Sequence, residues 1–497
     1  MSEAAHSPGS FARAFGSLSL ASGVSMAANL VRGKLAALFL GPAGVGIYNQ
    51  LSLMWNLFQI SGSLGAFSGL VQHGSEALIA KDEAALRRLA STWWILLTVF
   101  SCMLAATGAL VSPAISNLLL GDHGAHASLV ALTFASIPFA VSSQVYRALL
   151  SAARLVPQLV RAQIGSDVGG AIVFAALTPV LGLPGAIIGF ATIHLIFYIM
   201  TALSVRKMLG ASYVRPRRSE FIWKVVRSNL GFGAIALATI ALSNISIILV
   251  SRLLIDSHGI EASGIFSNAW RIASVYLGAV TTTAISYYLP TLNRAESDEQ
   301  LRSHCNAALR FYLYALPLVM AGIMTAGEPI VWLILSAKFM AVAPLLLLFV
   351  PAELMRVLAE TINVPLYSRR RLNAFFFPYV LQALIFIVGS YLALPSYGAM
   401  GAAAAYGVAT TTAAIANLVA CRIRLGITLE RRTIVAFVRA AALLIGVMNA
   451  GLLIPFGVER LLVAGTAALL WCVWTLQDHE VRRTVLGYAP WRSRTAG

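Results

Sequence analysis

The sequence is poor in charged residues, and acidic residues are the scarcest of them. Charged residues make up only 11% of the 497 positions, and the chain has 19 Asp and Glu against 36 Lys and Arg. Soluble globular domains usually carry about 25% charged residues. Because 59% of the residues are hydrophobic, the composition excludes a soluble protein and predicts an all-α polytopic membrane protein.

Signals for enzyme chemistry are also missing. The four cysteines lack the spacing of a disulfide framework or a metal site. The sequence has neither a paired-carboxylate motif in a loop nor a nucleotide-binding signature. The glycine-rich stretch Gly41–Gly46 follows a membrane helix rather than a strand, which argues against a phosphate-binding loop. We therefore expect no catalytic residue, no metal and no cofactor, and we predict that the protein is not an enzyme.

Long hydrophobic runs, by contrast, recur along the chain. A helix needs about 20 predominantly apolar residues to cross a bilayer, and hydropathy predicts about fourteen such helices. Their predicted spans are 15–40, 45–70, 91–112, 127–150, 157–180, 184–205, 229–252, 264–289, 311–335, 342–366, 373–394, 398–420, 438–456 and 460–477.

Lysine and arginine gather in alternate loops, with a large group between residues 206 and 227. Such residues mark the cytoplasmic side of membrane proteins, so both termini are predicted to be cytoplasmic. We interpret these loops as topology signals that rest on anionic headgroups. The net charge of +17 then needs no nucleic-acid partner. Loops on the opposite side are short and leave no room for a large catalytic loop.

The two halves of the chain resemble each other in parallel order. Matching segments are Lys34-Leu35 with Arg252-Leu253 and Gly46–Tyr48 with Gly264–Phe266 (offset 218), Ser151–Leu155 with Ser368–Leu372 (offset 217), and Gly185-Ala186 with Gly398-Ala399 (offset 213). Transporters are commonly built from such repeats, with the substrate site between them. The pattern therefore predicts two six-helix lobes related by a pseudo-two-fold repeat, followed by a C-terminal helix pair.

This organisation divides the chain into four predicted parts. They are an N-lobe of helices 1 to 6 (1–210), a cytoplasmic inter-lobe loop that serves as the hinge (211–228), a C-lobe of helices 7 to 12 (229–425), and helices 13 and 14 with a cytoplasmic tail (426–497).

Several cations lie inside or at the ends of apolar spans. Arg32, Lys34, Arg271 and Arg356 are predicted to be intramembrane, and Arg252 ends a helix. A cation at a helix centre costs about 2.5–3.5 kcal/mol on insertion scales, so each is expected to face water, protein or an anion. Together they predict a cationic, substrate-binding cavity between the halves. Lys34 is the favoured cavity residue of the first helix because the repeat gives it a partner.

Acidic residues in apolar spans are rarer still. Glu353, Arg356 and Glu360 are spaced by three and four residues and are predicted to share one helix face. That stripe is either a self-neutralising contact with a neighbouring helix or a gating or ion-coupling element. Glu328 precedes Pro329 and is interpreted either as a structural partner of a kink or as an ion-coupling or gating residue. Asp167, also in an apolar span, is expected to pair with nearby Arg161.

Four motifs follow one another along the chain: Gly33-Lys34-Leu35 with Gly41–Gly46, Tyr287–Arg294, Leu333–Phe339 and Gly398–Tyr406. In this order they resemble the motifs of Wzx-type polysaccharide flippases of the multidrug/oligosaccharidyl-lipid/polysaccharide (MOP) exporter superfamily. The similarity covers about residues 15–425. The chain departs from many such proteins by adding two helices, as in the lipid II flippase branch of the superfamily.

The resemblance implies a flippase of the bacterial inner membrane. Its substrate would be an undecaprenyl-diphosphate-linked oligosaccharide, turned from the cytoplasmic to the periplasmic leaflet by alternating access for exopolysaccharide or O-antigen assembly. The expected partners are membrane lipids, a polysaccharide polymerase, chain-length and export proteins, and a coupling proton or sodium ion.

Three alternatives remain open. A multidrug or small-molecule antiporter of the same superfamily would favour intramembrane acids over cations. A polytopic polysaccharide polymerase or ligase would need a large periplasmic loop. A non-transporting assembly scaffold would tolerate substitutions in the cavity.

Overall fold

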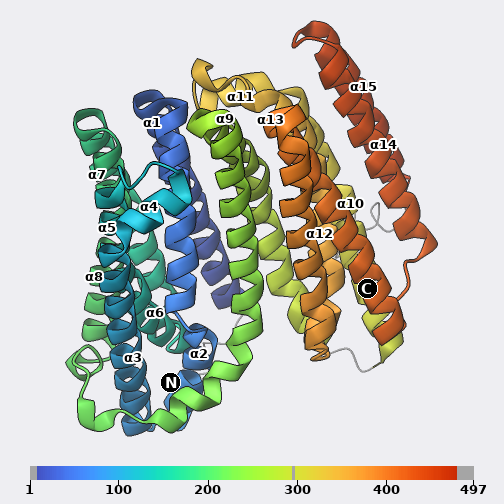
Figure 1. Cartoon of the computed structure of the whole chain (residues 1–497). Coiled ribbons are helices and arrows are strands. Elements are labelled where there is room, and N and C mark those ends of the chain that lie inside the picture. The colour runs from blue at the N-terminus through green and yellow to red at the C-terminus, as the bar shows by residue number, and fades with distance from the viewer. Residues whose placement is uncertain (1–7, 294–296, 478–497) are drawn as a thin grey trace. The chain divides into compact units, whose positions relative to one another are not determined.

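The computed structural model describes the backbone of residues 8–293 and 297–477 (Figure 1). Side chains are described from residue 22 on, except at 68, 224–225, 227–234, 236, 275–291 and 293. The α-helices are α1 (Pro8–Gly62), α2 (Ala66–Ile79), α3 (Glu83–Leu110), α4 (Ser112–Leu120), α5 (Ala127–Ala135), α6 (Ile137–Ala152), α7 (Val156–Leu181), α8 (Leu183–Met208), α9 (Trp223–Asn293), α10 (Asp298–Thr325), α11 (Gly327–Ile334), α12 (Val342–Ser368), α13 (Leu372–Leu425), α14 (Arg431–Leu453) and α15 (Val458–Leu476). Short 3₁₀ turns are η2 (Ala211–Tyr213), η3 (Arg218–Glu220) and η4 (Ala337–Phe339), and no strand occurs in the described residues.

Within the described residues, eleven helical stretches are long and apolar enough to cross a membrane. Three of them, in α1, α9 and α13, are each two helices that meet at a glycine with non-helical dihedrals: Gly41, Gly259 and Gly398. Positive φ is available to glycine at little steric cost, and such positions kink helices. Counting each bent stretch as two confirms the predicted polytopic fold of about fourteen membrane helices.

The kinks also establish the register of the repeat. Gly41 (φ 65°, ψ −177°) and Gly259 (φ 84°, ψ 170°) share the offset of 218. In the second part of each half, Arg154 and Arg370 both have the left-handed backbone conformation and are 216 residues apart. The glycines Gly182 (φ 64°) and Gly398 (φ 53°) are also 216 residues apart. The repeat is confirmed, but the offsets of 217 and 213 were wrong by a few residues because short Ala- and Gly-rich motifs match in several registers.

Some boundaries also differ from the prediction. The predicted span 311–335 begins earlier, at Asp298, where the Ser297 hydroxyl caps the helix by accepting from the Gln300 backbone N–H at 3.2 Å. It ends at Thr325, and α11 follows as a separate short helix. The early start escaped detection because the first turns of α10 are polar and carry no hydropathy signal. The helices α2 and α4, too short to cross a membrane, were not predicted.

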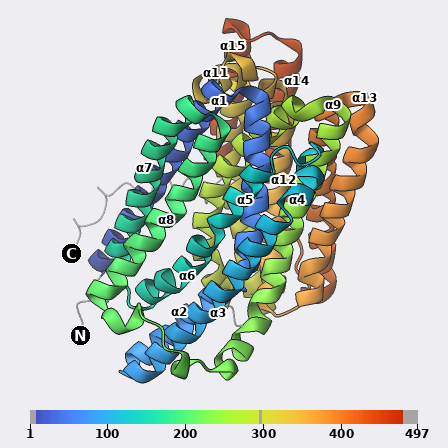
Figure 2. The same ribbon diagram turned by 60° about the vertical axis from the view of Figure 1, so that its left-hand side comes forward.

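The described residues form two compact units. The first contains residues up to Ser267 together with Leu333–Phe339, and the second contains Asn268–Trp332 and the residues from Met340. In the first unit α7 packs against α8 and against α1, and α6 packs against α2, α3 and α8 (Figure 2). These units are not the four predicted parts, whose boundaries stay a prediction.

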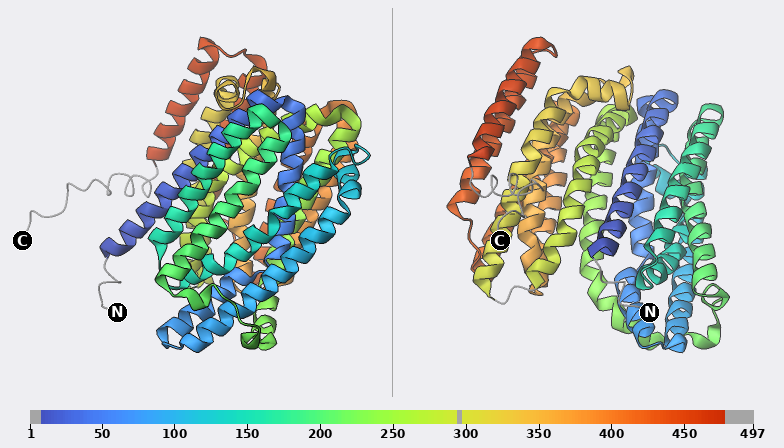
Figure 3. Two further views of the ribbon diagram at one scale, coloured as in Figure 1. Left: turned by 90° about the vertical axis from the view of Figure 1, so that its left-hand side faces the viewer. Right: turned by 180° about the vertical axis from the view of Figure 1, so that it is seen from behind.

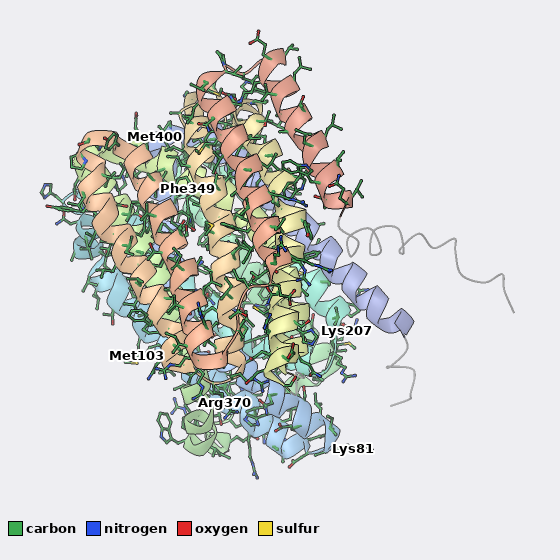
Figure 4. All side chains as sticks on the ribbon, turned by 90° about the vertical axis from the view of Figure 1, so that its right-hand side faces the viewer. Lys81, Met103, Lys207, Phe349, Arg370 and Met400 are labelled. Carbon is green, nitrogen blue, oxygen red and sulfur yellow. The ribbon has the colours of Figure 1, made fainter. Side chains whose placement is uncertain are left out.

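In the second unit α12 is the most enclosed membrane helix, with 72% of its 18-residue apolar stretch buried, and it packs chiefly against α13. Arg370, just before α13, and Met400, just beyond its kink, lie at opposite ends of this helix pair (Figure 4). The helices α14 and α15 form a hairpin that packs on α10 (Figure 3).

Candidate functional site

Three charged residues of α12 form one ion-pair network, as their spacing predicts. The Arg356 Nε donates to Glu353 Oε2 at 2.7 Å, and Arg356 Nη1 donates to Glu360 Oε1 at 2.5 Å. Across the helix interface, the Tyr406 hydroxyl of α13 donates to Glu353 Oε1 at 2.6 Å. The network therefore joins α12 to α13 inside the second unit.

The two carboxylates of this network have different surroundings. The Glu353 side chain is fully buried, whereas Glu360 is 29% exposed and Arg356 is 20% exposed. One guanidinium is thus shared by two carboxylates. The self-neutralising contact and the gating or ion-coupling element both stay predictions for this stripe.

Tyr406 was missed as part of this site. In the sequence it ends the small-residue run Gly398–Ala405, which indicates close helix packing rather than chemistry. Its single polar atom in an otherwise apolar, tightly packed stretch was the available signal, because a buried tyrosine hydroxyl usually finds a hydrogen-bond partner.

The first unit holds the cations of helix α1. Arg32 is 7% exposed and donates through Nη2 to Asn29 Oδ1 at 2.6 Å, while Lys34 is half-buried. The different burial of Arg32 and Lys34 agrees with their pointing in different directions. His194 lies close enough to Arg32 for a Coulombic interaction and stacks on Trp55 with ring centroids 4.0 Å apart.

Arg252, the repeat partner of Lys34, lies against an interhelical loop of the same unit. Its Nη2 pairs with Asp256 Oδ1 at 2.9 Å, and its guanidinium packs on Gly121, where a Cβ would lie 2.0 Å from Nη1. The buried Nη1 atom has no hydrogen-bond partner among the described residues. Arg252 is thus a partly satisfied cation beside the Gly121 loop.

That loop is organised by Asp122. The carboxylate accepts from the Ser116 hydroxyl, from the backbone N–H groups of Gly124 and His126, and pairs with the His126 ring at 2.6 Å. Burial raises the pKa of Asp122, but the hydrogen bonds from His126, Ser116 and the backbone outweigh it and lower the pKa below its usual value.

Arg271 lies on α9 in the second unit and is half-buried. Within the described part of the chain, no residue forms a hydrogen bond or ion pair with it. A partly exposed, uncompensated cation on a membrane helix has the chemistry expected of an anion-binding residue.

Glu328 of α11 pairs with Arg460 of α15, which is 3% exposed. Arg460 Nη1 donates to both carboxylate oxygens at 3.0 and 3.2 Å, and its Nη2 donates to the Met324 carbonyl at 2.8 Å. This geometry fits a clamp between the C-terminal hairpin and the end of α10. A coupling role for Glu328 stays a prediction.

A second clamp holds the other end of that hairpin. Arg310 Nη1 donates to Glu430 Oε2 at 2.6 Å, and Asn306 accepts from the Glu430 backbone N–H at 2.9 Å and from the Thr433 hydroxyl at 2.8 Å. Sequence reasoning missed this cluster because its two halves lie far apart in the chain and all four members sit in predicted loop regions.

Asp167 does not pair with Arg161 as expected. It is 4% exposed, and its carboxylate accepts from the Ser25 hydroxyl of α1 and from the Gln163 side chain at 2.8 Å. Neutral donors on two packed helices thus satisfy the Asp167 carboxylate. Arg161 was predicted as its partner only because it is near in the sequence.

The predicted site residues are thus distributed over both units. Arg32, Lys34 and Arg252 belong to the first, and Arg271, Arg356 and the three acids belong to the second. Their assembly into a single cavity stays a prediction. The described residues contain no group of three His, Cys, Asp or Glu suited to a metal ion.

Comparison with known proteins gives consistent relatives. The chain is 24% identical to the lipid III flippase of Escherichia coli K12 over 77% of this chain and 91% of the relative. Its fold is similar to that of the lipid II flippase MurJ in an inward closed conformation (TM-score 0.73, 15% identity, 93% of this chain and 98% of the other). It is also similar to an inward-facing multidrug resistance MATE family transporter of the MOP superfamily (TM-score 0.66, 17% identity, 83% and 98%).

A family model described as "polysaccharide biosynthesis protein" matches residues 35–344, which is more than half of the chain. The match spans the second half of the kinked helix α1 and the whole of α9, and it includes Arg252 and Arg271. The chain therefore belongs to the polysaccharide biosynthesis protein family and has the multi-pass fold of MOP-superfamily exporters.

Proposed function

We propose that the protein is a flippase that translocates an undecaprenyl-diphosphate-linked oligosaccharide from the cytoplasmic to the periplasmic leaflet by alternating access. Membership of the polysaccharide biosynthesis family, a lipid III flippase as a sequence relative and a lipid II flippase as a structural neighbour support it. The substrate would serve exopolysaccharide or O-antigen assembly, and chain-length, export and polymerase proteins would act on the product.

The observation that carries the proposal is the set of membrane cations at repeat-related and half-buried positions. A sugar headgroup cannot cross about 30 Å of hydrocarbon without losing its hydrogen bonds to water. Lys34, Arg252, Arg271 and Arg356 would replace that hydration for the diphosphate, with Arg32 in a supporting place. Arginine suits phosphate because its planar guanidinium can form two parallel hydrogen bonds.

The remaining assignments follow from charge distribution. The protein would lie in the bacterial inner membrane with both termini in the cytoplasm, because the alternate loops that include residues 206–227 carry most of the Lys and Arg. A proton or sodium gradient would drive transport, and Glu353 and Glu360 would form the coupling or gating element.

A multidrug antiporter is the second candidate, favoured by the fold shared with a MATE transporter. A site for cationic drugs needs uncompensated acids. In the described residues Glu353, Glu360 and Glu328 each pair with an arginine, whereas Arg271 has no acidic partner. This balance favours an anionic substrate.

A leaflet assay in a strain deleted for the gene tests the proposal. Accumulation of lipid-linked repeat units in the cytoplasmic leaflet, with loss of polymer, is the expected result. Unpolymerised units in the periplasmic leaflet would point instead to a polymerase or assembly role. Unchanged glycan lipids together with increased drug sensitivity would favour the antiporter.

A further inference from the structure

In the ion-pair network of α12, Arg356 binds the carboxylates of Glu353 and Glu360 with unequal strength. Glu353 is fully buried and accepts two hydrogen bonds, one from Arg356 Nε and one from the Tyr406 hydroxyl. Glu360 accepts a hydrogen bond from Arg356 Nη1 and is 29% exposed. Glu353 is therefore the fixed partner of the guanidinium, and Glu360 is the partner that can leave.

The exposed edge of the network faces a polar medium. A charged side chain turned to hydrocarbon is strongly disfavoured, so the exposed parts of Arg356 and Glu360 must meet water or a polar ligand. Arg356 is held in place on its buried side by Glu353. The nitrogen that binds Glu360, Nη1, can exchange one oxygen anion for another while Nε keeps its bond to Glu353.

We propose that Glu360 occupies on Arg356 the place that a substrate phosphate takes during transport, and that the displaced carboxylate takes up a proton. The inference rests on the proposed function and adds the uptake of one proton by the protein when the substrate binds. The Nη1 hydrogen bond passes from a Glu360 oxygen to a phosphate oxygen. One proton from water joins the freed carboxylate and cancels one of the negative charges that the phosphate brings.

The titratable side chains that interact with the network from the packed helices are tyrosines. From α13, Tyr406 and Tyr379 interact with the network, and from α10, Tyr312 interacts with Glu360. Tyrosines are neutral at physiological pH because their ordinary pKa is about 10. The other packed helix, α14, brings no titratable side chain into a described contact with Glu360.

If Glu360 and a substrate phosphate compete for Arg356, the affinity for a diphosphate ligand should depend on pH. The purified full-length protein in lipid nanodiscs is titrated with geranylgeranyl diphosphate between pH 6 and pH 8. Proton uptake is followed in weak buffer with a pH indicator. Because the ligand's own protonation is common to every variant, the difference between wild type and Glu360→Gln reports on this residue alone.

The expected results differ clearly between variants. Wild type takes up one more proton per bound diphosphate than Glu360→Gln, and its affinity rises relative to that variant as the pH falls. At pH 8, Glu360→Gln binds about 10- to 100-fold more tightly, the range of one charged hydrogen bond. Glu360→Asp keeps the wild-type pH dependence. Glu76→Gln, on the exposed part of α2, is the matched control and behaves as wild type.

The experiment distinguishes a failure of the proposed function from a failure of the proposed competition at Arg356. If wild type binds geranylgeranyl diphosphate no better than geranylgeraniol, the proposed function is wrong. If it binds the diphosphate selectively but Glu360→Gln has the same proton uptake and affinity, the function stands and the competition is wrong. Melting curves and gel filtration confirm that each variant is folded before either conclusion is drawn.

Discussion

Gly46 and Gly264 hold equivalent places in the two repeats and lie against each other. A Cβ on Gly264 would lie 2.1 Å from the Pro42 carbonyl oxygen and 3.1 Å from the Gly46 nitrogen. One turn further, the equivalent pair Asn49 and Ser267 is joined by a hydrogen bond of 2.9 Å. Equivalent positions of the internal repeat therefore meet at this crossing, inside the first unit.

Replacing Gly264 by valine should prevent the crossing. The added side chain meets backbone atoms that cannot rotate away, and overpacking of this kind costs about 1–3 kcal/mol. We expect a lower melting temperature of the purified protein and reduced polysaccharide export. Gly446→Val on α14, where a Cβ meets nothing within 4 Å, is the control. Wild-type melting of Gly264→Val would refute the close contact.

Removing cations of the proposed cavity should impair export without reducing protein levels. Lys34→Ala and Arg271→Ala are each expected to lower export at least about tenfold, since the loss of one charge-assisted hydrogen bond costs about 1.5–3 kcal/mol. Arg218→Ala, on the exposed turn η3, should leave export unchanged. Polymer yield normalised to membrane abundance measures the effect. Normal export by both cavity variants would contradict the cationic site.

The clamp between Arg460 and Glu328 should stabilise the C-terminal hairpin. Arg460→Met leaves a carboxylate without its cation, and we expect a loss of about 3 kcal/mol, near the lower end for broken buried pairs because Glu328 is 31% exposed. The double variant Arg460→Met with Glu328→Gln should melt closer to wild type. Arg424→Ala, an exposed cation on α13, serves as control. Additive losses in the double variant would argue against the pair.

The loop around Asp122 should open at acid pH. A carboxyl whose pKa is lowered by folding stabilises the loop fully above its ordinary pKa of 3.8, and the contribution is lost as the pH falls through the lowered value. Hydrogen exchange at the Gly124 and His126 amides should therefore accelerate below about pH 4. Asp122→Asn should abolish this pH dependence. Equal protection at pH 3 and pH 7 in wild type would be the opposite result.

Much of the fold was predictable because membrane helices have a strong local signal. Apolar length predicted the fourteen helices, and the repeated positions of Gly and of Lys or Arg indicated the two halves. The predicted stripe Glu353–Arg356–Glu360 followed from helical spacing alone. The helices and the stripe depend only on neighbours within a few residues, and the repeat needs only a comparison of the chain with itself.

The tertiary partners were not predictable in the same way. Spacing put Glu353 beside Arg356 but could not find Tyr406, which lies 53 residues away. Glu328 and Arg460 are 132 residues apart, and nothing in either local stretch marks them as a pair. The contacts of the loop predicted as a hinge (211–228) were also missed. Glu220 of this loop binds Arg87 and Ser91 of α3 at 2.6 and 2.7 Å, so this part of the loop is packed against α3.

The two clamps on the C-terminal hairpin have a practical consequence. Arg310 and Arg460 secure opposite ends of the α14–α15 hairpin to α10 and α11. The hairpin is therefore expected to move together with these helices. A fluorophore on its exposed surface, for example at Leu462 (64% exposed), would report every rotation of α10 during a transport cycle without touching the site itself.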